Sequence, residues 1–320
     1  MAELLLNAYT PLIVWTGLGV VLFRFLPDIL PRLIGRTLYW VGIPVMIFSL
    51  ARRANFSSEV GLAPLMTVGA ILLGFIGAWL SLQGIRALAT RRGSEELPLL
   101  GQVIFDRDRQ GSFILSSVLG NTGFVGLAIV PSLIANANLS WAILYSVTQN
   151  IFGTYGLGVL LASYYGRQSG NYLILQIRDV LTVPSLWAFT LGYLTRPLPF
   201  IPVVEVGLQR SIWVVIPTAL LLMGMRLSQL QGWRSLQAAI LPTLLKMAVL
   251  PACIGLITTL AGLRGDPRLT IVLMSGMPTA FAGLILAEEY ELNRDLIASS
   301  IALSSVALLL TLPIWLAVFG

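Results

Sequence analysis

Long apolar segments follow one another along nearly the whole chain, with short connections between most of them. A helix needs about 20 mostly apolar residues to cross a bilayer, and the sequence contains ten candidate segments: 4–23, 34–51, 62–88, 112–134, 139–164, 171–194, 208–226, 237–262, 268–289 and 295–319. Hydrophobic residues make up 57% of the 320 residues and charged residues 11%, which excludes a soluble globular domain. The sequence therefore predicts an all-α integral membrane protein with ten transmembrane helices.

The distribution of arginine predicts how these helices are oriented. Lysine and arginine are enriched in short cytoplasmic loops. The odd-numbered connections contain thirteen arginines and the even-numbered ones contain six, so the odd-numbered connections are predicted to be cytoplasmic. With ten spans, both termini then lie on the outer side of the membrane. This orientation also explains the net charge of +6 without a nucleic-acid partner.

Three short patterns occur once in each half of the chain, in the same order. They are Trp-x-x-Ile-Pro at 40–44 and 213–217, a proline near the start of the third and eighth segments (Pro64 and Pro242), and Thr-x-Phe-x-Gly-Leu at 122–127 and 279–284. Each half has an odd number of spans, so the second half enters the membrane from the opposite side. The sequence therefore predicts two inverted five-helix repeats, residues 1–164 and 165–320.

The repeated Thr-x-Phe-x-Gly-Leu pattern marks the predicted centre of the protein. Glycine and asparagine at 120–123 and the Pro278-Thr279 pair weaken a helix, so the fourth and ninth segments are predicted to break within the membrane. A break exposes backbone amides and a half-helix N-terminus with partial positive charge, and two such ends favour an anion, most simply a carboxylate. The alternative is that these small residues only allow close helix packing. The predicted crossover and hinge residues are Gly120, Gly126, Ala128, Gly276 and Gly283.

Three further polar residues lie deep in apolar segments, where polar groups are costly unless they face a partner or a cavity. Gln149 and Asn150 either line a binding site or form hydrogen bonds between helices. Lys246, the only lysine, either neutralises a bound anion or pairs with backbone carbonyls, since snorkelling to a surface requires a long reach. The candidate substrate-binding residues are Asn121, Thr122, Gly123, Gln149, Asn150, Lys246, Pro278 and Thr279.

Other chemistries have no candidate residues in the sequence. No aspartate or glutamate lies deep in an apolar segment, and the chain has no histidine. A buried carboxylate proton carrier, a carboxylate sodium site and a histidine relay are therefore not predicted. Cys253 is the only cysteine, which excludes an intrachain disulfide. No catalytic triad or metal-ligand set is evident, and we expect no enzymatic activity, no cofactor and no bound metal.

Several stretches of the sequence, in order, resemble the auxin efflux carrier family of membrane transporters. They are Tyr39 to Arg52, Gly120 to Leu127, Pro184 to Leu227, Met277-Pro278, Leu286 to Tyr290 and Thr311 to Pro313. The resemblance implies a ten-helix fold with two inverted repeats, akin to bile-acid sodium symporters and some sodium/proton antiporters. It also implies a dimerising scaffold of spans 1, 2, 6 and 7 and a moving transport domain of spans 3–5 and 8–10, in which spans four and nine cross.

The resemblance also assigns residues and substrates. It implies that Asn121 is the crossover asparagine that contacts substrate, that Gln149 is the glutamine of the fifth helix, and that Lys246 is a lysine common in bacterial members. Family members transport organic anions such as auxin, malonate or malate. Ala128 and Gly283 stand where plant members have crossover prolines, and the long cytoplasmic loop of many plant members is missing. The chain is therefore more similar to short bacterial carriers of the inner (plasma) membrane.

The leading functional hypothesis is a secondary carrier of a small organic anion. It would work by an elevator-type movement of the transport domain against a homodimeric scaffold within the lipid bilayer. The alternative is a sodium- or proton-coupled symporter or antiporter of the related fold, in which Asn121, Gln149, Asn150 and backbone carbonyls hold sodium. A membrane enzyme or receptor is a third alternative, with no supporting motif.

Overall fold

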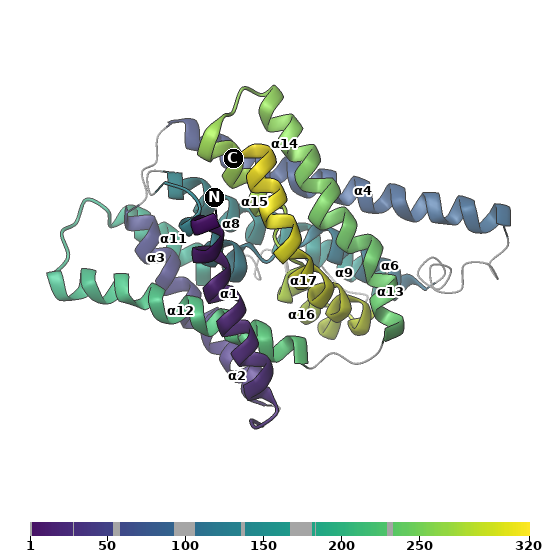
Figure 1. Ribbon diagram of the computed structural model, residues 1–320, viewed down its shortest axis with the longest axis horizontal. Helices are drawn as coiled ribbons and strands as arrows, with labels where there is room; N and C mark the ends of the chain where they lie inside the picture. The colour runs from purple at the N-terminus through teal and green to yellow at the C-terminus, as the bar shows by residue number, and fades with distance from the viewer. Residues whose placement is uncertain are drawn as a thin grey trace. The chain divides into compact units, whose positions relative to one another are not determined.

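The computed structural model describes residues 2–27, 29–53, 58–92, 106–135, 138–166, 181–182, 184–228 and 233–320 (Figure 1). Nearly all regular structure in these residues is helical, and they contain no β-strand. The one β-type pairing among them is an isolated antiparallel bridge between Gly120 and Thr279. The prediction of an all-α protein is confirmed for these residues.

Five helical stretches in the described part of the chain are long and apolar enough to cross a bilayer. They are Leu30–Arg53, Leu62–Thr90, Pro202–Ser228, Leu236–Leu260 and Arg294–Phe319, and two shorter apolar helices cover Thr10–Phe23 and Thr122–Ser132. The five long stretches coincide with the second, third, seventh, eighth and tenth predicted segments. Much of the sixth predicted segment, 171–194, lies outside the described residues. The full number of ten spans stays a prediction.

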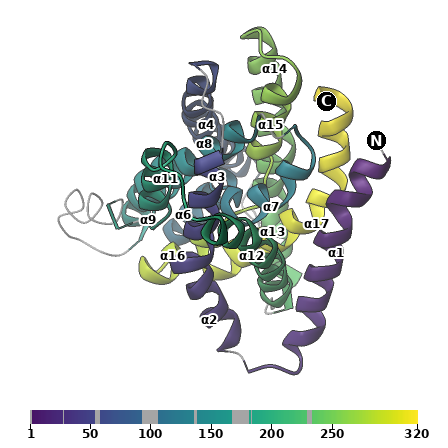
Figure 2. The same ribbon diagram turned by 90° about the vertical axis from the view of Figure 1, so that its left-hand side faces the viewer.

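The chain forms two compact units, and each unit combines segments from both halves of the sequence. The first unit comprises residues 1–63, 122–147 and 181–229. Its helices are α1 (Ala2–Phe23), α2 (Leu30–Thr37), α3 (Ile43–Arg53), α7 (Leu127–Ile129), most of α8 (Leu139–Thr148), α11 (Pro184–Leu194) and α12 (Pro202–Ser228). A π-helical turn, Leu38–Gly42, joins α2 to α3 without interruption. Within this unit α1 packs along α12, and α11 packs along α3 (Figures 1 and 2).

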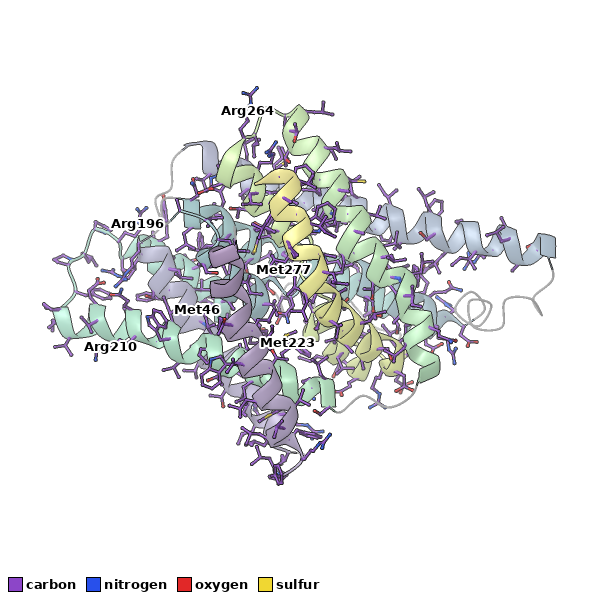
Figure 3. All side chains as sticks on the ribbon, in the orientation of Figure 1. Met46, Arg196, Arg210, Met223, Arg264 and Met277 are labelled. Atoms are coloured by element: carbon purple, nitrogen blue, oxygen red, sulfur yellow. The ribbon has the colours of Figure 1, made fainter. Side chains whose placement is uncertain are left out.

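Glycines bring α1 and α12 into backbone contact. A Cβ atom added at Gly224 of α12 would lie 2.0 Å from the carbonyl oxygen of Thr16, and one added at Gly19 of α1 would lie 2.1 Å from the carbonyl oxygen of Leu221. Without side chains at these positions the helices approach closely, which increases van der Waals contact where no hydrophobic force drives helices together. Met46 and Met223 are buried in the same unit, whereas Arg210 is exposed (Figure 3).

Substituting Gly224 by alanine is expected to destabilise the first unit. The new methyl group must push α1 away from α12, and overpacking of this kind costs about 1–3 kcal/mol. Thermal unfolding of the purified protein in detergent measures the effect as a lower Tm. Gly17→Ala is the matched control on α1, because nothing lies within 4 Å of a Cβ atom there. An equal Tm for the two variants would show that the close approach is unimportant for stability.

The end of α3 is fixed to the connection between α11 and α12 by Arg52. Its guanidinium group donates to the carbonyl oxygens of Thr195 and Leu198, the latter at 2.9 Å, and pairs with Glu205 Oε1 at 2.7 Å. It also lies 3.7 Å from the centre of the Phe200 ring. The Arg52 side chain is only 6% exposed, so these contacts replace much of its hydration. This arginine therefore has a structural role in the first unit.

The second unit comprises residues 64–121, 148–180 and 230–320. Its helices are α4 (Leu62–Arg92), α6 (Arg107–Val118), α9 (Val159–Tyr165), α13 (Trp233–Leu244), α14 (Leu250–Leu260), α15 (Gly265–Ser275), α16 (Phe281–Glu289) and α17 (Arg294–Phe319). Every residue of α6 from Gln110 to Val118 is buried, and α13, α16 and α17 pack against this helix. Because α6 is enclosed in this way, its C-terminal end lies in the interior of the unit.

Candidate functional site

The fourth predicted segment is interrupted at residues 119–121. Helix α6 ends at Val118, and Leu119 has an extended backbone with φ −78° and ψ 114°. A π-helical turn, Thr122–Gly126, begins the next helix. Gly120 and Asn121 favour the interruption because glycine has a low helix propensity and asparagine competes for backbone hydrogen bonds.

The ninth predicted segment is interrupted at residues 276–280. Helix α15 ends at Ser275 and α16 begins at Phe281, after Ala280 in an extended conformation with φ −75° and ψ 140°. Pro278 favours this interruption because it has no backbone N–H and disfavours helical geometry in the residue before it, Met277 (Figure 3).

The two interruptions are hydrogen-bonded to each other. The backbone N–H of Asn121 donates to the carbonyl oxygen of Pro278 at 2.7 Å, and the N–H of Ala280 donates to the carbonyl oxygen of Leu119 at 2.9 Å. Gly120 and Thr279 stand opposite each other between these bonds as an antiparallel pair. Backbone groups freed by a break in a membrane helix need partners inside the protein. Here each break supplies them to the other.

Thr279 attaches this pair to the neighbouring helices. Its hydroxyl donates to the carbonyl oxygen of Ser116 at 3.0 Å, and its backbone N–H donates to the Ser304 hydroxyl at 3.0 Å. All three residues are buried. Carbonyls in the last turn of a helix have no intrahelical partner, so the threonine hydroxyl satisfies one such group of α6.

Two polar side chains meet at the last carbonyl of α6. Lys246 Nζ donates to the carbonyl oxygen of Val118 at 3.2 Å, and Gln149 Nε2 donates to the same oxygen at 3.4 Å. Lys246 is 1% exposed and Gln149 is 2% exposed. Among the described residues this carbonyl is the only hydrogen-bond partner of the lysine side chain. The C-terminal end of α6, with its partial negative charge, is therefore capped by a cation and an amide.

Lys246 and Gln149 both lie in π-helical turns. Residues Leu245–Val249 join α13 to α14, and residues Gln149–Gly158 join α8 to α9. A π-turn rotates the following side chains relative to a regular α-helix and is frequent at functional sites. A Cβ atom added at Gly153 would lie 2.7 Å from Gln149 Nε2, so the glycine leaves room for the amide.

Comparison with known proteins identifies the family. The sequence model described as membrane transport protein, which represents the auxin efflux carriers, matches residues 99–316. The chain belongs to this family. It is similar to an uncharacterized transporter of Methanothermobacter thermautotrophicus, with 26% identity over 88% of this chain and 87% of the relative. It is also similar to an uncharacterized transporter of Methanocaldococcus jannaschii, with 27% identity over 68% of this chain and 71% of the relative.

Membership of the auxin efflux carrier family confirms the resemblance seen in the sequence and makes the protein a membrane transporter. The relatives are named as transporters and not as enzymes. The apolar helices described above agree with integral membrane insertion. Among the described residues, no group of three or more histidine, cysteine, aspartate or glutamate side chains is arranged to hold a metal ion.

In the second unit the structure brings together most of the candidate residues. Gly120, Asn121, Pro278 and Thr279 form the paired interruptions, and Gln149 and Lys246 meet beside them at Val118. Asn150 follows Gln149 in the same π-helical stretch and is half-buried.

The remaining candidates have simpler surroundings. Gly276 ends α15, where an added Cβ atom would lie 3.2 Å from the Pro251 ring, and Gly283 of α16 has room for a methyl group. The candidates that belong to the first unit are Thr122, Gly123, Gly126 and Ala128. Of these, the Thr122 hydroxyl is buried without a hydrogen-bond partner among the described residues.

Several residues of the site were not found from the sequence. Val118 and Leu119 contribute only their carbonyl oxygens, for which no side-chain signal exists. The sequence could have indicated Ser304, because it lies four residues after Ser300 within an apolar segment. In the structure both hydroxyls are buried. Polar residues with that spacing share one face of a helix.

Proposed function

We propose that the protein is a secondary carrier of a small organic anion and that the anion binds at the paired interruptions of the fourth and ninth segments. The observation that carries the proposal is the position of a buried lysine and a buried asparagine at two broken helices. In transporters, such breaks occur where a substrate binds near the middle of the membrane.

The charge balance of the site favours an anion. Lys246 is buried, whereas no aspartate or glutamate in the described residues is. A buried charge without a counter-charge is costly, and a negatively charged substrate lowers that cost when it binds nearby. The N-terminus of α16, which follows the second interruption, adds partial positive charge.

The hydrogen-bonding groups fit a carboxylate. Asn121 has an amide N–H₂ group that can donate to a carboxylate oxygen, and its backbone N–H is already used in the pair with Pro278. A small carboxylate with two oxygens at one end is therefore the simplest substrate class for this site.

The proposed mechanism is of the elevator type. The paired interruptions, Gln149 and Lys246 all lie in the second unit, which supports a transport unit that moves as one body with its substrate. In this proposal spans 1, 2, 6 and 7 are the scaffold and form a homodimer, and spans 3–5 and 8–10 are the moving transport domain. The proposed topology has ten spans in two inverted repeats, with both termini outside. The proposed location is the inner (plasma) membrane.

Thermal unfolding in the presence of carboxylates tests whether the site binds an anion. Purified protein in detergent is heated with each member of a panel of monocarboxylates and dicarboxylates, with chloride at equal ionic strength as the reference. A ligand that binds only the folded protein stabilises it by RT ln(1 + [L]/Kd), so Tm keeps rising with ligand concentration. We expect one or more small carboxylates to raise Tm in this concentration-dependent way. A panel that leaves Tm unchanged, while amines or sugars raise it, would contradict an anion site.

A further inference from the structure

The Val118 carbonyl stands where a carrier of this architecture can hold a cation. It lies at the C-terminal end of α6, directly before the interruption, and a helix C-terminus carries partial negative charge. In transporters with broken helices, unwound carbonyls and half-helix C-termini coordinate the sodium ion or proton that is coupled to the substrate. In this protein the same position is occupied by the ammonium group of Lys246, 3.2 Å from the oxygen.

Hydrophobic packing does not account for this lysine. A buried ammonium group loses its hydration, and an apolar residue of similar length would avoid that cost. Its hydrogen bond to Val118 joins residues 128 positions apart in the chain. The π-helical turn Leu245–Val249 contains the lysine, and Gln149 donates to the same oxygen from another π-helical stretch. Two local departures from regular helix thus converge on one carbonyl.

We propose that Lys246 is a built-in cation that replaces a dissolved coupling cation at the C-terminal end of α6. This inference rests on the proposed carrier function. Because the cation is covalently attached, binding and transport of the anion need no sodium. Lys246 is a positioning residue in this scheme, since it holds the end of α6 next to Asn121 and supplies a fixed positive charge.

Removal of the ammonium group is expected to create a site for a small monovalent cation. In Lys246→Ala the Val118 carbonyl loses its charged partner and the volume of the lysine side chain is released. Gln149 can turn its amide so that Oε1 faces the same space, because the amide has one donor end and one acceptor end. Sodium can then bind with these oxygens and water as ligands. In Lys246→Arg a fixed cation remains, and no sodium site is expected.

Thermal unfolding of the full-length protein in sodium chloride and in choline chloride, at equal ionic strength, tests the proposal. We expect the Tm of the wild type to be the same in the two salts, and we expect the same of the Tm of Lys246→Arg. Lys246→Ala should have a lower Tm in choline, and sodium should raise it by about 3 °C or more, with a rise that grows with the logarithm of the sodium concentration above the Kd. Thr243→Val is the control on the preceding turn of the same helix. It removes a buried hydroxyl that lacks a partner among the described residues, and it should show no effect of sodium.

Two results would overturn the proposal that Lys246 is a built-in cation. One is a sodium-dependent Tm in the wild type, which shows that a dissolved cation is already bound. The other is a Lys246→Ala protein that sodium does not stabilise, including one that remains unfolded in both salts. Neither measurement requires a substrate. A failure of the carrier proposal is seen as no carboxylate binding by the wild type, and it is therefore distinguishable from a failure of the built-in cation proposal.

Discussion

Substitution of Asn121 by alanine is expected to lower anion uptake by about 10- to 100-fold. A hydrogen bond to a charged group contributes about 1.5–3 kcal/mol, and each 1.4 kcal/mol corresponds to a tenfold change in affinity. The backbone N–H of residue 121 still donates to the Pro278 carbonyl oxygen after the substitution, so the paired interruptions should persist. Uptake of a labelled carboxylate by proteoliposomes measures the effect, with Tm as the test of folding.

A second substitution at the same position separates binding from structure. Asn121→Asp retains the shape of the side chain but replaces the amide by a carboxylate, which repels an anion. Uptake should therefore fall at least as far as in Asn121→Ala. If Asn121→Asp transports like the wild type, or if Asn121→Ala takes up the anion normally, Asn121 has no part in substrate binding.

Substitution of Ala280 by proline is expected to uncouple the two interruptions. Ala280 has φ −75°, which proline adopts without strain, and its N–H donates to the Leu119 carbonyl oxygen. Proline removes this donor and leaves a buried carbonyl unsatisfied, at a cost of about 1–3 kcal/mol. We expect a decrease in Tm of about 3–10 °C and loss of uptake, because the orientation of Asn121 depends on the same pair.

Ala280→Ser is the matched control for this prediction. Serine retains the N–H donor, and residue 280 is the N-cap of α16, a position where a serine hydroxyl stabilises a helix. Its Tm should equal or exceed that of the wild type, and uptake should be retained. Equal stability and uptake in the proline and serine variants would mean that the hydrogen bond between the interruptions is dispensable.

The places where the helices break follow closely from the sequence. The sequence predicts weak helix at 120–123 and at 278–279, and the structure has non-helical residues at 119–121 and 276–280. Residues 122 and 123 were predicted to be weak helix but are helical, because Thr122 and Gly123 occupy the first turn of the next helix. Glycine is tolerated in a first turn, since the amides there have no intrahelical partner.

The partners of the polar residues did not follow from the sequence. Lys246 was predicted to face either an anion or backbone carbonyls, and the structure places its ammonium group on the Val118 carbonyl oxygen. Gln149 likewise donates to this oxygen. A backbone acceptor has no residue type, so no motif could reveal it. The π-helical turns at Gln149–Gly158 and Leu245–Val249 were also missed, because tertiary contacts decide such turns more than local propensity does.

Counterflow in proteoliposomes tests the central claim most directly. Vesicles that contain the wild-type protein are loaded with the unlabelled carboxylate that raises Tm most, and entry of the labelled compound is followed in sodium and in choline buffers. The proposed carrier should show saturable entry that is equal in both buffers and at least about tenfold lower in Asn121→Ala. Entry no faster than into vesicles without protein, or equal entry with Asn121→Ala, would contradict an anion site at the paired interruptions.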